Sequence, residues 1–536
     1  DNYVVSPSTV ETLTSGTEYD AGYRYHVKTA YNVTWSVNGT NTTQTYNRNE
    51  TPSYGSTPAI NDGDTWEFVG WSPEIAPVTT DVTYTAVFKK YEAEIILPNG
   101  TSKRYESFAT AWADVKQIQT ATIRLLSDVS SSAQLQYNPA PPSGTTAEDE
   151  AYFTNATTTL DLNNHTLAYT GTADRFLYTN KTGSKLIIAD NSAGKGGTLK
   201  YDGSRDGALI CAATHFGDLE LQSGTIFSRN TYTGKSSYAV YPCKETTFTM
   251  TGGTINAYGK SSPSAIRTES GTPVVNVSGG KLLASTEYDN SGTPAYGSKA
   301  YGVYGITGAT ITISGNPDIE AVAADNAYAV FTNGANAKFD ISGGTFSAIT
   351  KTGTLAVGAC ATNQSKDNVI SGGTFTAVSA GQYAHGVYSY TNAKISVSGG
   401  RFEVTGNGQT YAARVGNWGD NGNEMDISGG TFITHKGTSG SNFEGLRAYT
   451  HSTVNISGGT FTNTDGSGLQ FYGGDITISG NTVVKSSSFA ISASGAFISN
   501  DANVAKVTVN GGTFITTGSN VAVYSSHATK EVNGEY

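Results

Sequence analysis

Apolar and polar residues alternate in short segments that recur along most of the chain. In residues 339–346 the apolar Phe339 and Ile341 flank Asp340, and a Ser-Gly-Gly run separates them from Thr345 and Phe346. Alternation with a period of two predicts strands, and the glycine pair predicts a tight corner between them. Copies of this segment follow one another at roughly 27–30 residues, a spacing typical of solenoids. The glycine pairs of the clearest consecutive copies begin at Gly343, Gly372, Gly399, Gly429 and Gly458, and a further copy has its pair at Gly511.

A third short apolar segment follows each pair of strands. It reads Gly-Val-Tyr at residues 302–304, Ala-Val-Phe at 329–331 and Gly-Val-Tyr at 386–388. A repeat of three strands per coil with a glycine corner indicates a parallel β-helix. A βαβ sheet is disfavoured because no helical pattern lies between the strands. We therefore predict an all-β fold, with a right-handed parallel β-helix over residues 121–536.

The phenylalanine that closes each repeat predicts the core. Equivalent residues of successive coils lie directly above one another, about 4.8 Å apart, in a parallel stack of strands. One ladder of rings is expected from Phe346, Phe375, Phe402, Phe432, Phe461 and Phe514.

The first 90 residues have a different pattern. Residues 1–22 are polar and predict a tail or a single added strand, and residues 23–90 contain strands separated by proline-containing turns. The segments Tyr54-Gly55, FVGWSP (68–73), PVT (77–79) and DVTYTAVF (81–88) closely resemble the internalin-type B repeat of the Listeria–Bacteroides repeat family. The resemblance implies a β-grasp-like module of prokaryotic cell-surface proteins, a spacer or adhesive unit without catalytic residues.

Residues 91–120 are expected to link this module to the solenoid. A strand at 95–97 and a turn at 98–100 precede apolar residues at helical spacing. These are Phe108, Ala109, Trp112, Val115 and Ile118. A short amphipathic helix here would cap the first coil, which a solenoid requires.

The net charge limits the classes of partner, and the cysteines raise the question of a disulfide. The net charge of −11 argues against a nucleic-acid or anionic-membrane partner, and no apolar run has the length of a membrane span. Cys211 and Cys243 occupy similar places in successive coils, so a disulfide between coils is one hypothesis and two buried thiols the other.

An enzyme that acts on polysaccharides must be considered, because many parallel β-helices have that activity. The position before the corner carries Glu220, Asp340 and Asp426, and the last two are expected three coils, or roughly 14 Å, apart. That is too far to share one bond or one ion. The histidines have no metal-ligand spacing. We therefore expect no catalytic residue, metal or cofactor.

A binding surface is expected on the third strand of each coil. The residue after its inward Val or Leu should point outward, beside a shelf of outward Ala and Gly residues two positions earlier. This outward row reads Tyr178, Ile210, Tyr241, Arg267, Tyr304, Phe331, Gly358, Tyr388, Arg414, Arg447, Gln470, Ser492 and Tyr524. The candidate ligand-binding residues are Tyr241, Arg267, Tyr304, Phe331, Tyr388, Arg414, Arg447 and Tyr524. The alternative is that these side chains only shield the sheet.

Threonines form a second expected outward row, interrupted by Lys281 and Arg401. A regular, flat row of threonines would be compatible with ice binding, but the two interrupting cations disfavour that function. The row comprises Thr254, Thr345, Thr374, Thr431, Thr460, Thr482 and Thr513.

Together these features predict a non-enzymatic, secreted or cell-surface protein of a prokaryote with an adhesive or structural role. Its expected partners are host or cell-wall glycans or surface proteins. The first alternative is a filament subunit, in which the N-terminal region of one copy pairs with the open C-terminal coil of the next. A polysaccharide-active enzyme is the weaker alternative.

Overall fold

The computed structural model confirms the all-β class, with 57% of residues in strands and 2% in helices. Contacts divide the chain into one unit of residues 1–94 and 104–108 and a second of residues 95–103 and 109–536. The structure describes residues 2–5, 9–12, 25–60, 65–141, 155–203, 209–215, 217–231, 236–286, 298–440, 442–493, 505–526 and 530–532.

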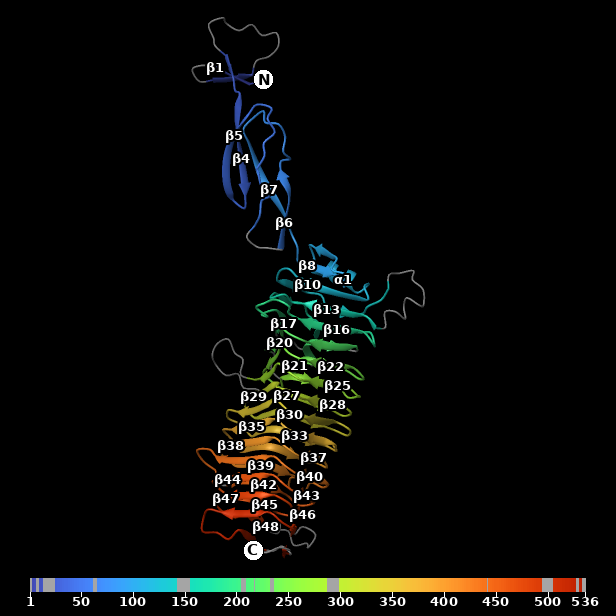
Figure 1. The fold of residues 1–536 in the computed structure, drawn as a ribbon, viewed down its shortest axis with the longest axis vertical. Coiled ribbons are helices and arrows are strands. Elements are labelled where there is room, and N and C mark those ends of the chain that lie inside the picture. The colour runs from blue at the N-terminus through green and yellow to red at the C-terminus, as the bar shows by residue number, and fades with distance from the viewer. Residues whose placement is uncertain are drawn as a thin grey trace. The chain divides into compact units, whose positions relative to one another are not determined.

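The second unit is a parallel β-solenoid, as predicted, over residues 157–525 (Figure 1). Each coil contributes one strand to each of three sheets. The first sheet contains β10 (Thr120–Leu125), β13 (Thr157–Asp161), β16 (Lys185–Ala189), β19 (Asp218–Leu221), β22 (Thr247–Met250), β25 (Val274–Val277), β28 (Thr310–Ile313), β31 (Lys338–Ile341), β34 (Asn368–Ile370), β37 (Lys394–Val397), β40 (Asn423–Ile427), β43 (Ser452–Ile456), β46 (Gly474–Ile478), β49 (Ala505–Val509) and β52 (Lys530–Val532).

The second sheet follows the glycine corner and carries the phenylalanines. Its strands are β11 (Val129–Ser131), β14 (Thr166–Tyr169), β17 (Thr198–Gly203), β20 (Thr225–Asn230), β23 (Thr254–Gly259), β26 (Lys281–Ser285), β29 (Asp318–Ala323), β32 (Thr345–Thr350), β35 (Thr374–Ser379), β38 (Arg401–Gly406), β41 (Thr431–Lys436), β44 (Thr460–Asn463), β47 (Val483–Ser486) and β50 (Thr513–Thr516).

The third sheet carries the candidate binding row. Its strands are β12 (Leu135–Tyr137), β15 (Arg175–Thr179), β18 (Leu209–His215), β21 (Ser236–Pro242), β24 (Ser264–Arg267), β27 (Lys299–Ile306), β30 (Asn326–Asn333), β33 (Leu355–Thr362), β36 (Tyr383–Ser389), β39 (Gln409–Val415), β42 (Asn442–Ala448), β45 (Ser467–Phe471), β48 (Ile491–Ala493) and β51 (Val523–Ser525).

Both glycines of the corner are required, for different reasons. A side chain at Gly372 would meet the backbone carbonyl of Ser342 in the preceding coil. Gly373 has a φ of 93°, in the left-handed region that glycine adopts most easily. The stacked coils and the turn between the first and second sheets therefore each exclude a larger residue.

The predicted phenylalanine ladder is the core of the second half of the solenoid. The rings of Phe346, Phe375, Phe402, Phe432 and Phe461 stack with centroids 4.4, 4.8, 4.8 and 4.6 Å apart and nearly parallel planes. All five are fully buried. Val484 lies between Phe461 and Phe514 in the register, so the last ring is separated from the others by one coil.

The helix expected before the first coil is present as α1 (Phe108–Val115). Trp112 lies 6.1 Å from the ring of Tyr137 in β12, and its indole N–H donates to the carbonyl of Gln136 at 3.2 Å. Val115 is also buried. The apolar face of the helix therefore covers the first coil. No helix in the described part of the chain has the length and apolar character needed to cross a membrane.

The first unit contains a mixed four-stranded sheet and a small antiparallel one. In the order β5-β4-β7-β6, the strands β4 (Ala30–Val37) and β7 (Val82–Lys90) are parallel, while β5 (Thr40–Asn47) and β6 (Trp66–Ser72) pair antiparallel on the outside. Its core is built around Trp35, whose ring lies 4.6 Å from Trp71 and 5.2 Å from Tyr84.

The N-terminal segment differs from the single strand or tail that was predicted. β1 (Asn2–Val5) pairs antiparallel with both β2 (Thr9–Thr12) and β3 (Tyr25–Val27). Two short strands, β1 and β2, therefore lie where one strand was predicted. The remaining strands, β8 (Ala93–Ile96) and β9 (Ser102–Tyr105), precede α1.

Candidate functional site

The eight candidate binding residues lie at one position of the third-sheet strands. The register pairs Arg267 with Tyr304, Tyr304 with Phe331, and Tyr388 with Arg414. It continues from Arg414 to Arg447. Two other members of the predicted row are wrong, since the register puts Thr214 and Cys360 where Ile210 and Gly358 were expected. The cause at Cys360 is that Ala359, and not Val357, takes the inward place.

The expected shelf of small outward residues is also wrong, because those residues face the core. A side chain at Gly358 would lie 3.0 Å from Cβ of Phe375, and one at Gly386 would lie 2.9 Å from Cβ of Phe402. Ala329 is fully buried at the equivalent position. The phenylalanine ladder fills the space in front of the third sheet and leaves room only for Gly or Ala.

A second outward column therefore lies three residues before the first. In it Tyr301 pairs with Tyr328, and Tyr328 with Val357. The two columns pack against each other into a layer outside the sheet. We call this the outer aromatic layer, which comprises Tyr238, Tyr241, Arg267, Tyr301, Tyr304, Tyr328, Phe331, Val357, Cys360, His385, Tyr388, Tyr411, Arg414, Glu444 and Arg447.

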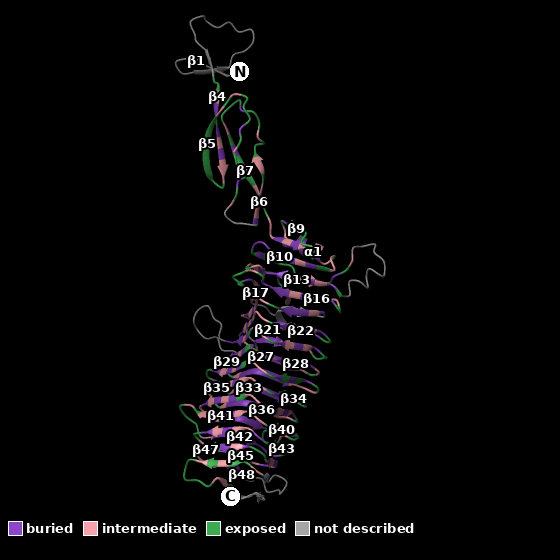
Figure 2. Cartoon of the chain, in the orientation of Figure 1, coloured by how far each residue is buried: buried purple, intermediate pink, exposed green. Residues whose placement is uncertain are grey.

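Most of the outer aromatic layer is covered by its own side chains. Tyr304 is 9% exposed, Phe331 5% and Tyr388 4%, and the middle of the solenoid is drawn largely as buried in Figure 2. Tyr524, in contrast, is 41% exposed. The expectation that the whole row is free for a ligand is therefore wrong for its centre, where the side chains shield the sheet.

The arginines of the layer lie between aromatic rings. The guanidinium of Arg267 is 4.8 Å from the ring centre of Tyr238 and 4.7 Å from that of Tyr304. Arg414 lies 4.7 Å from Tyr388 and 5.0 Å from Tyr449. Such contacts stabilise by about 0.5–2 kcal/mol each, more where the cation is desolvated. The layer therefore ties successive coils together from outside.

Arg447 extends this arrangement toward the next coils. Its guanidinium lies 4.3 Å from the ring centre of Tyr411 and 4.9 Å from that of Tyr472. It also forms a buried ion pair with Glu444. Burial raises the pKa of Glu444 to about 7, although Arg447 opposes the shift.

His385 is the other buried ionisable group of the layer. Its Nε2 lies 3.0 Å from Nη1 of Arg414, and its ring stacks on Tyr411 with centroids 5.2 Å apart. Burial and, secondarily, the Arg414 charge lower the pKa of His385 well below its ordinary value. The imidazole is therefore neutral and accepts a hydrogen bond from the guanidinium.

One exposed aromatic residue was missed by the sequence analysis. Trp418 lies in the loop after β39 and is 51% exposed, while its ring packs 5.2 Å from Tyr449 and 5.7 Å from Tyr472. The signal was present as a tryptophan in the loop sequence Gly-Asn-Trp-Gly at 416–419, where no alternating pattern assigns it to the core.

Two of the three corner carboxylates, Asp426 and Glu220, form ion pairs with neighbouring lysines. The register puts Asp340 and Asp426 three coils apart, as predicted. Asp426 pairs with Lys394 at 2.8 Å and accepts from Asn455 at 2.8 Å. Glu220 forms an ion pair with Lys185.

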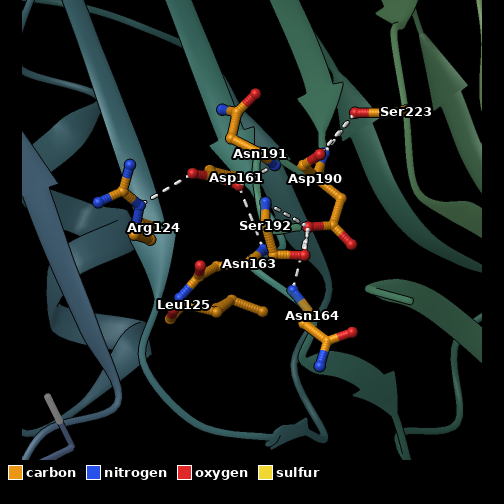
Figure 3. Close-up of polar contacts among 9 residues, drawn as sticks. All are labelled: Arg124, Leu125, Asp161, Asn163, Asn164, Asp190, Asn191, Ser192 and Ser223. Carbon is orange, nitrogen blue, oxygen red and sulfur yellow. Dashed lines mark hydrogen bonds and ion pairs between the residues drawn. The ribbon is translucent and has the colours of Figure 1, made fainter. Parts of the chain in front are cut away.

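A second pair of carboxylates, at the turns of the first coils, binds backbone groups (Figure 3). Asp161 accepts from the backbone N–H of Asn163 at 3.2 Å and of Asn191 at 2.9 Å, and it pairs with Arg124 at 2.9 Å. Asp190 accepts from the backbone N–H of Asn164 at 3.1 Å, and both the N–H and the hydroxyl of Ser192 point toward it in the figure.

These contacts give the two aspartates a structural role. Burial raises the pKa of Asp190, but the hydrogen bonds from Ser192, Gly197 and Asn164 outweigh it and lower the pKa overall. A carboxylate held ionised by backbone donors stabilises its turn. Within the described ranges, no three His, Cys, Asp or Glu side chains form a group that could hold a metal ion.

The disulfide hypothesis is disfavoured by the register. Ala213 lies opposite Val240 and His215 opposite Pro242, so Cys211 precedes the counterpart of Cys243 by five positions. The Cα atoms of a disulfide are usually about 4.4–6.8 Å apart. The side chain of Cys211 lies outside the described residues, so the pairing itself stays a prediction.

The threonine row is less regular than predicted. Asp318 interrupts it between Lys281 and Thr345, and Val483, not Thr482, continues it after Thr460. The additional interruptions weigh further against a flat ice-binding rank.

No protein-family model, no curated protein and no solved structure matches this chain. The resemblance of residues 23–90 to the internalin-type B repeat therefore stays an expectation based on its motif.

Proposed function

We propose that the chain is a non-enzymatic, extracellular protein of a prokaryotic cell surface with a structural and adhesive role. The solenoid is the support, and its side wall presents a binding surface to host or cell-wall glycans. The observation that carries the proposal is the outer aromatic layer. Stacked rings and desolvated arginines on the outside of a sheet stiffen the coils, and the layer leaves aromatic groups exposed only at particular points.

The first unit supports the cell-surface location. Its parallel central pair, β4 and β7, with one antiparallel neighbour on each side, is a strand arrangement compatible with the β-grasp-like module that the B-repeat resemblance implies. The tryptophan and tyrosine of the resembling motif, Trp71 and Tyr84, pack on Trp35 in its core. In proteins of that kind the module is a spacer or adhesive unit.

The enzymatic alternative has less support from the geometry. Of the carboxylates at the corners, Asp426 and Glu220 are held by lysines, and at the first turns Asp190 is held by backbone donors. A glycosidase requires two carboxyl groups about 5–9.5 Å apart across the scissile bond. The described carboxylates of the corner position, three coils apart at Asp340 and Asp426, do not meet that requirement.

An adhesion assay tests the proposal. Beads coated with the purified chain are applied to surfaces of mucin, of peptidoglycan and of albumin, and the attached fraction is counted under flow. We expect attachment to at least one glycan surface and none to albumin. Absence of attachment to any glycan surface, or release of reducing ends or unsaturated sugars when the chain is incubated with soluble polysaccharide, would contradict the proposal.

A further inference from the structure

We propose that Trp418 is the stacking residue of a binding site for a neutral sugar ring on the side wall of the solenoid. This inference rests on the proposed function and names the place and the class of ligand. Of the large aromatic side chains in the described part of the chain, Trp418 is the most exposed, at 51%.

Trp418 belongs to a platform of three aromatic side chains. Its ring meets Tyr449 at an interplanar angle of 71° and Tyr472 at 55°, while Tyr449 and Tyr472 stack on each other with centroids 5.9 Å apart. Tyr449 is buried and Tyr472 half-buried. The indole therefore stands on a fixed base, with about half of its surface in solvent.

The loop that carries Trp418 is fixed at both ends. The guanidinium of Arg414 donates to the carbonyl of Gly416 at 3.3 Å and to Oδ1 of Asn417 at 2.9 Å, and the same Oδ1 accepts from the backbone N–H of Trp418 at 3.0 Å. Further along, Asp420 accepts from the backbone N–H of Thr391 at 3.3 Å. The backbone N–H of Gly422 donates to the carbonyl of His451 at 3.3 Å.

This anchoring matters for binding because it removes most of the ordering cost. Flexible side chains and loops that must be immobilised on association lose conformational entropy, and this loss weakens binding. Arg414 is itself clamped between Tyr388 and Tyr449, so the loop is held by a group that cannot move easily. An exposed tryptophan held in this way is preorganised for a ligand that stacks on its face.

The surroundings favour a neutral sugar over the other candidates. A pyranose has a C–H face that packs on an aromatic ring and hydroxyl groups that bond to polar groups. The loop around Trp418 is rich in such groups, since its sequence reads Gly-Asn-Trp-Gly-Asp-Asn at 416–421. The nearest cations are engaged, Arg414 with the loop and His385, and Arg447 with Glu444. Neither is free to bind a carboxylated or sulfated sugar, and the chain's net charge of −11 adds repulsion.

A protein partner fits this surface less well. Stable protein interfaces bury about 1,200–2,000 Å² in total and contain several apolar anchors. Trp418 is one exposed ring within a polar loop, and the adjoining Tyr388, Phe331 and Tyr304 are covered by their own layer. A single ring in a polar loop matches a small ligand.

The test is binding of the full chain to an array of neutral and acidic oligosaccharides, including muropeptides, mucin-type glycans and β-linked glucans. Affinities for any glycan bound are then measured by isothermal titration calorimetry, a readout that does not depend on Trp418 itself. The variants are Trp418→Ala, Trp418→Phe and, as a matched control, Trp66→Ala in the first unit. Thermal midpoints verify that each variant is folded.

We expect the wild-type chain to bind neutral glycans, Trp418→Ala to lose at least about tenfold in affinity, and Trp418→Phe to keep part of it. Trp66→Ala should bind as the wild type does. Equal binding by Trp418→Ala and the wild type would overturn the site and leave the adhesive function standing. Binding of acidic glycans alone would overturn the ligand class, and absence of all glycan binding would overturn both this site and the proposed function.

Discussion

Gly386 shows why the residue next to the inward valine has to be small. A Cβ atom there would lie 2.9 Å from Cβ of Phe402 and 2.5 Å from the carbonyl oxygen of Ala412. The ring belongs to the second sheet and the carbonyl to the next coil, so neither can move without disturbing the stack. The same reasoning applies to Gly358 against Phe375.

Gly386→Val is therefore expected to destabilise the solenoid by about 1–3 kcal/mol, the usual cost of overpacking a dense core. The measurement is urea unfolding followed by circular dichroism. Thr376→Val is the control, because Thr376 is a half-buried residue on the outer side of β35. Equal midpoints for Gly386→Val and the wild type would show that the glycine does not face the ring ladder.

At Glu444 a single carboxyl group should make stability depend on pH. Its pKa of about 7 in the folded chain is above the ordinary value of 4.5, because burial disfavours the charge more than Arg447 and Arg414 favour it. At a pH between 4.5 and 7, the carboxyl group is therefore protonated in the folded chain and ionised in the unfolded chain. The contribution of Glu444 to the free energy of unfolding is therefore greatest below about pH 4.5 and is lost as the pH rises through 7.

We expect the thermal midpoint of Glu444→Gln to rise relative to that of the wild type as the pH increases from 5 to 8. The variant lacks the fall that the carboxyl group causes, while the opposite contribution of the buried, neutral His385 is present in both proteins. The neighbouring groups Arg447, Arg414 and Tyr411 are unchanged in the variant, so the difference reports the carboxyl group. A slope that is the same in both proteins would mean that Glu444 stays ionised in its ion pair throughout this range.

The elements that depend on local pattern could be predicted, and those that depend on packing between coils could not. The glycine corner, the ring ladder and helix α1 follow from alternation, paired glycines and helical spacing, which are properties of one repeat. The inward orientation of Gly302 and Gly358 follows from side chains of the second sheet, Ile319 and Phe375, and no pattern within the third strand indicates it. The predicted outward row is therefore correct at Tyr304, whereas it names Gly358 at the position that Cys360 occupies.

The prediction of the candidate site also failed where it depended on packing between coils. Alternation correctly places Tyr388 and Arg414 outside the core, but it says nothing about how far side chains cover one another. Tyr388 is 4% exposed because the second outward column and the arginines fill the surface around it. Trp418 lies in a loop without periodicity, and its exposure follows from the loop's anchoring by Arg414.

The phenylalanine ladder is the element on which the second half of the solenoid depends most. Phe402 has stacked neighbours on both sides, at 4.8 Å from Phe375 and 4.8 Å from Phe432. Phe402→Ala should lower the free energy of unfolding by about 3–5 kcal/mol, since it removes a buried ring and leaves a cavity between two others.

Chemical denaturation with a fluorescence or circular-dichroism readout measures this loss. Ile433→Ala, an apolar truncation on the outer side of the neighbouring strand β41, should cost much less. Similar losses for the two variants would contradict the assignment of the second-sheet faces. Stability in a solenoid is approximately a sum over coils and their interfaces, so the loss can appear as early melting of the middle coils.

At the scale of the whole molecule, we propose that a single chain is the functional support. The coils bury their own cores through the ring ladder, the helix α1 covers the first coil, and the outer aromatic layer closes most of one side wall. What remains for a partner is a side-wall surface around Trp418. In the alternative, copies of the chain associate end to end, and the residues 1–22 of one copy complete the sheets of another.

Light scattering with negative-stain electron microscopy over a concentration series separates these two accounts most directly. We predict single copies of the chain at every concentration, with the side wall free and the mass in solution independent of concentration. Regular filaments that grow with concentration and vanish when residues 1–22 are deleted would contradict the account and establish a polymerising subunit.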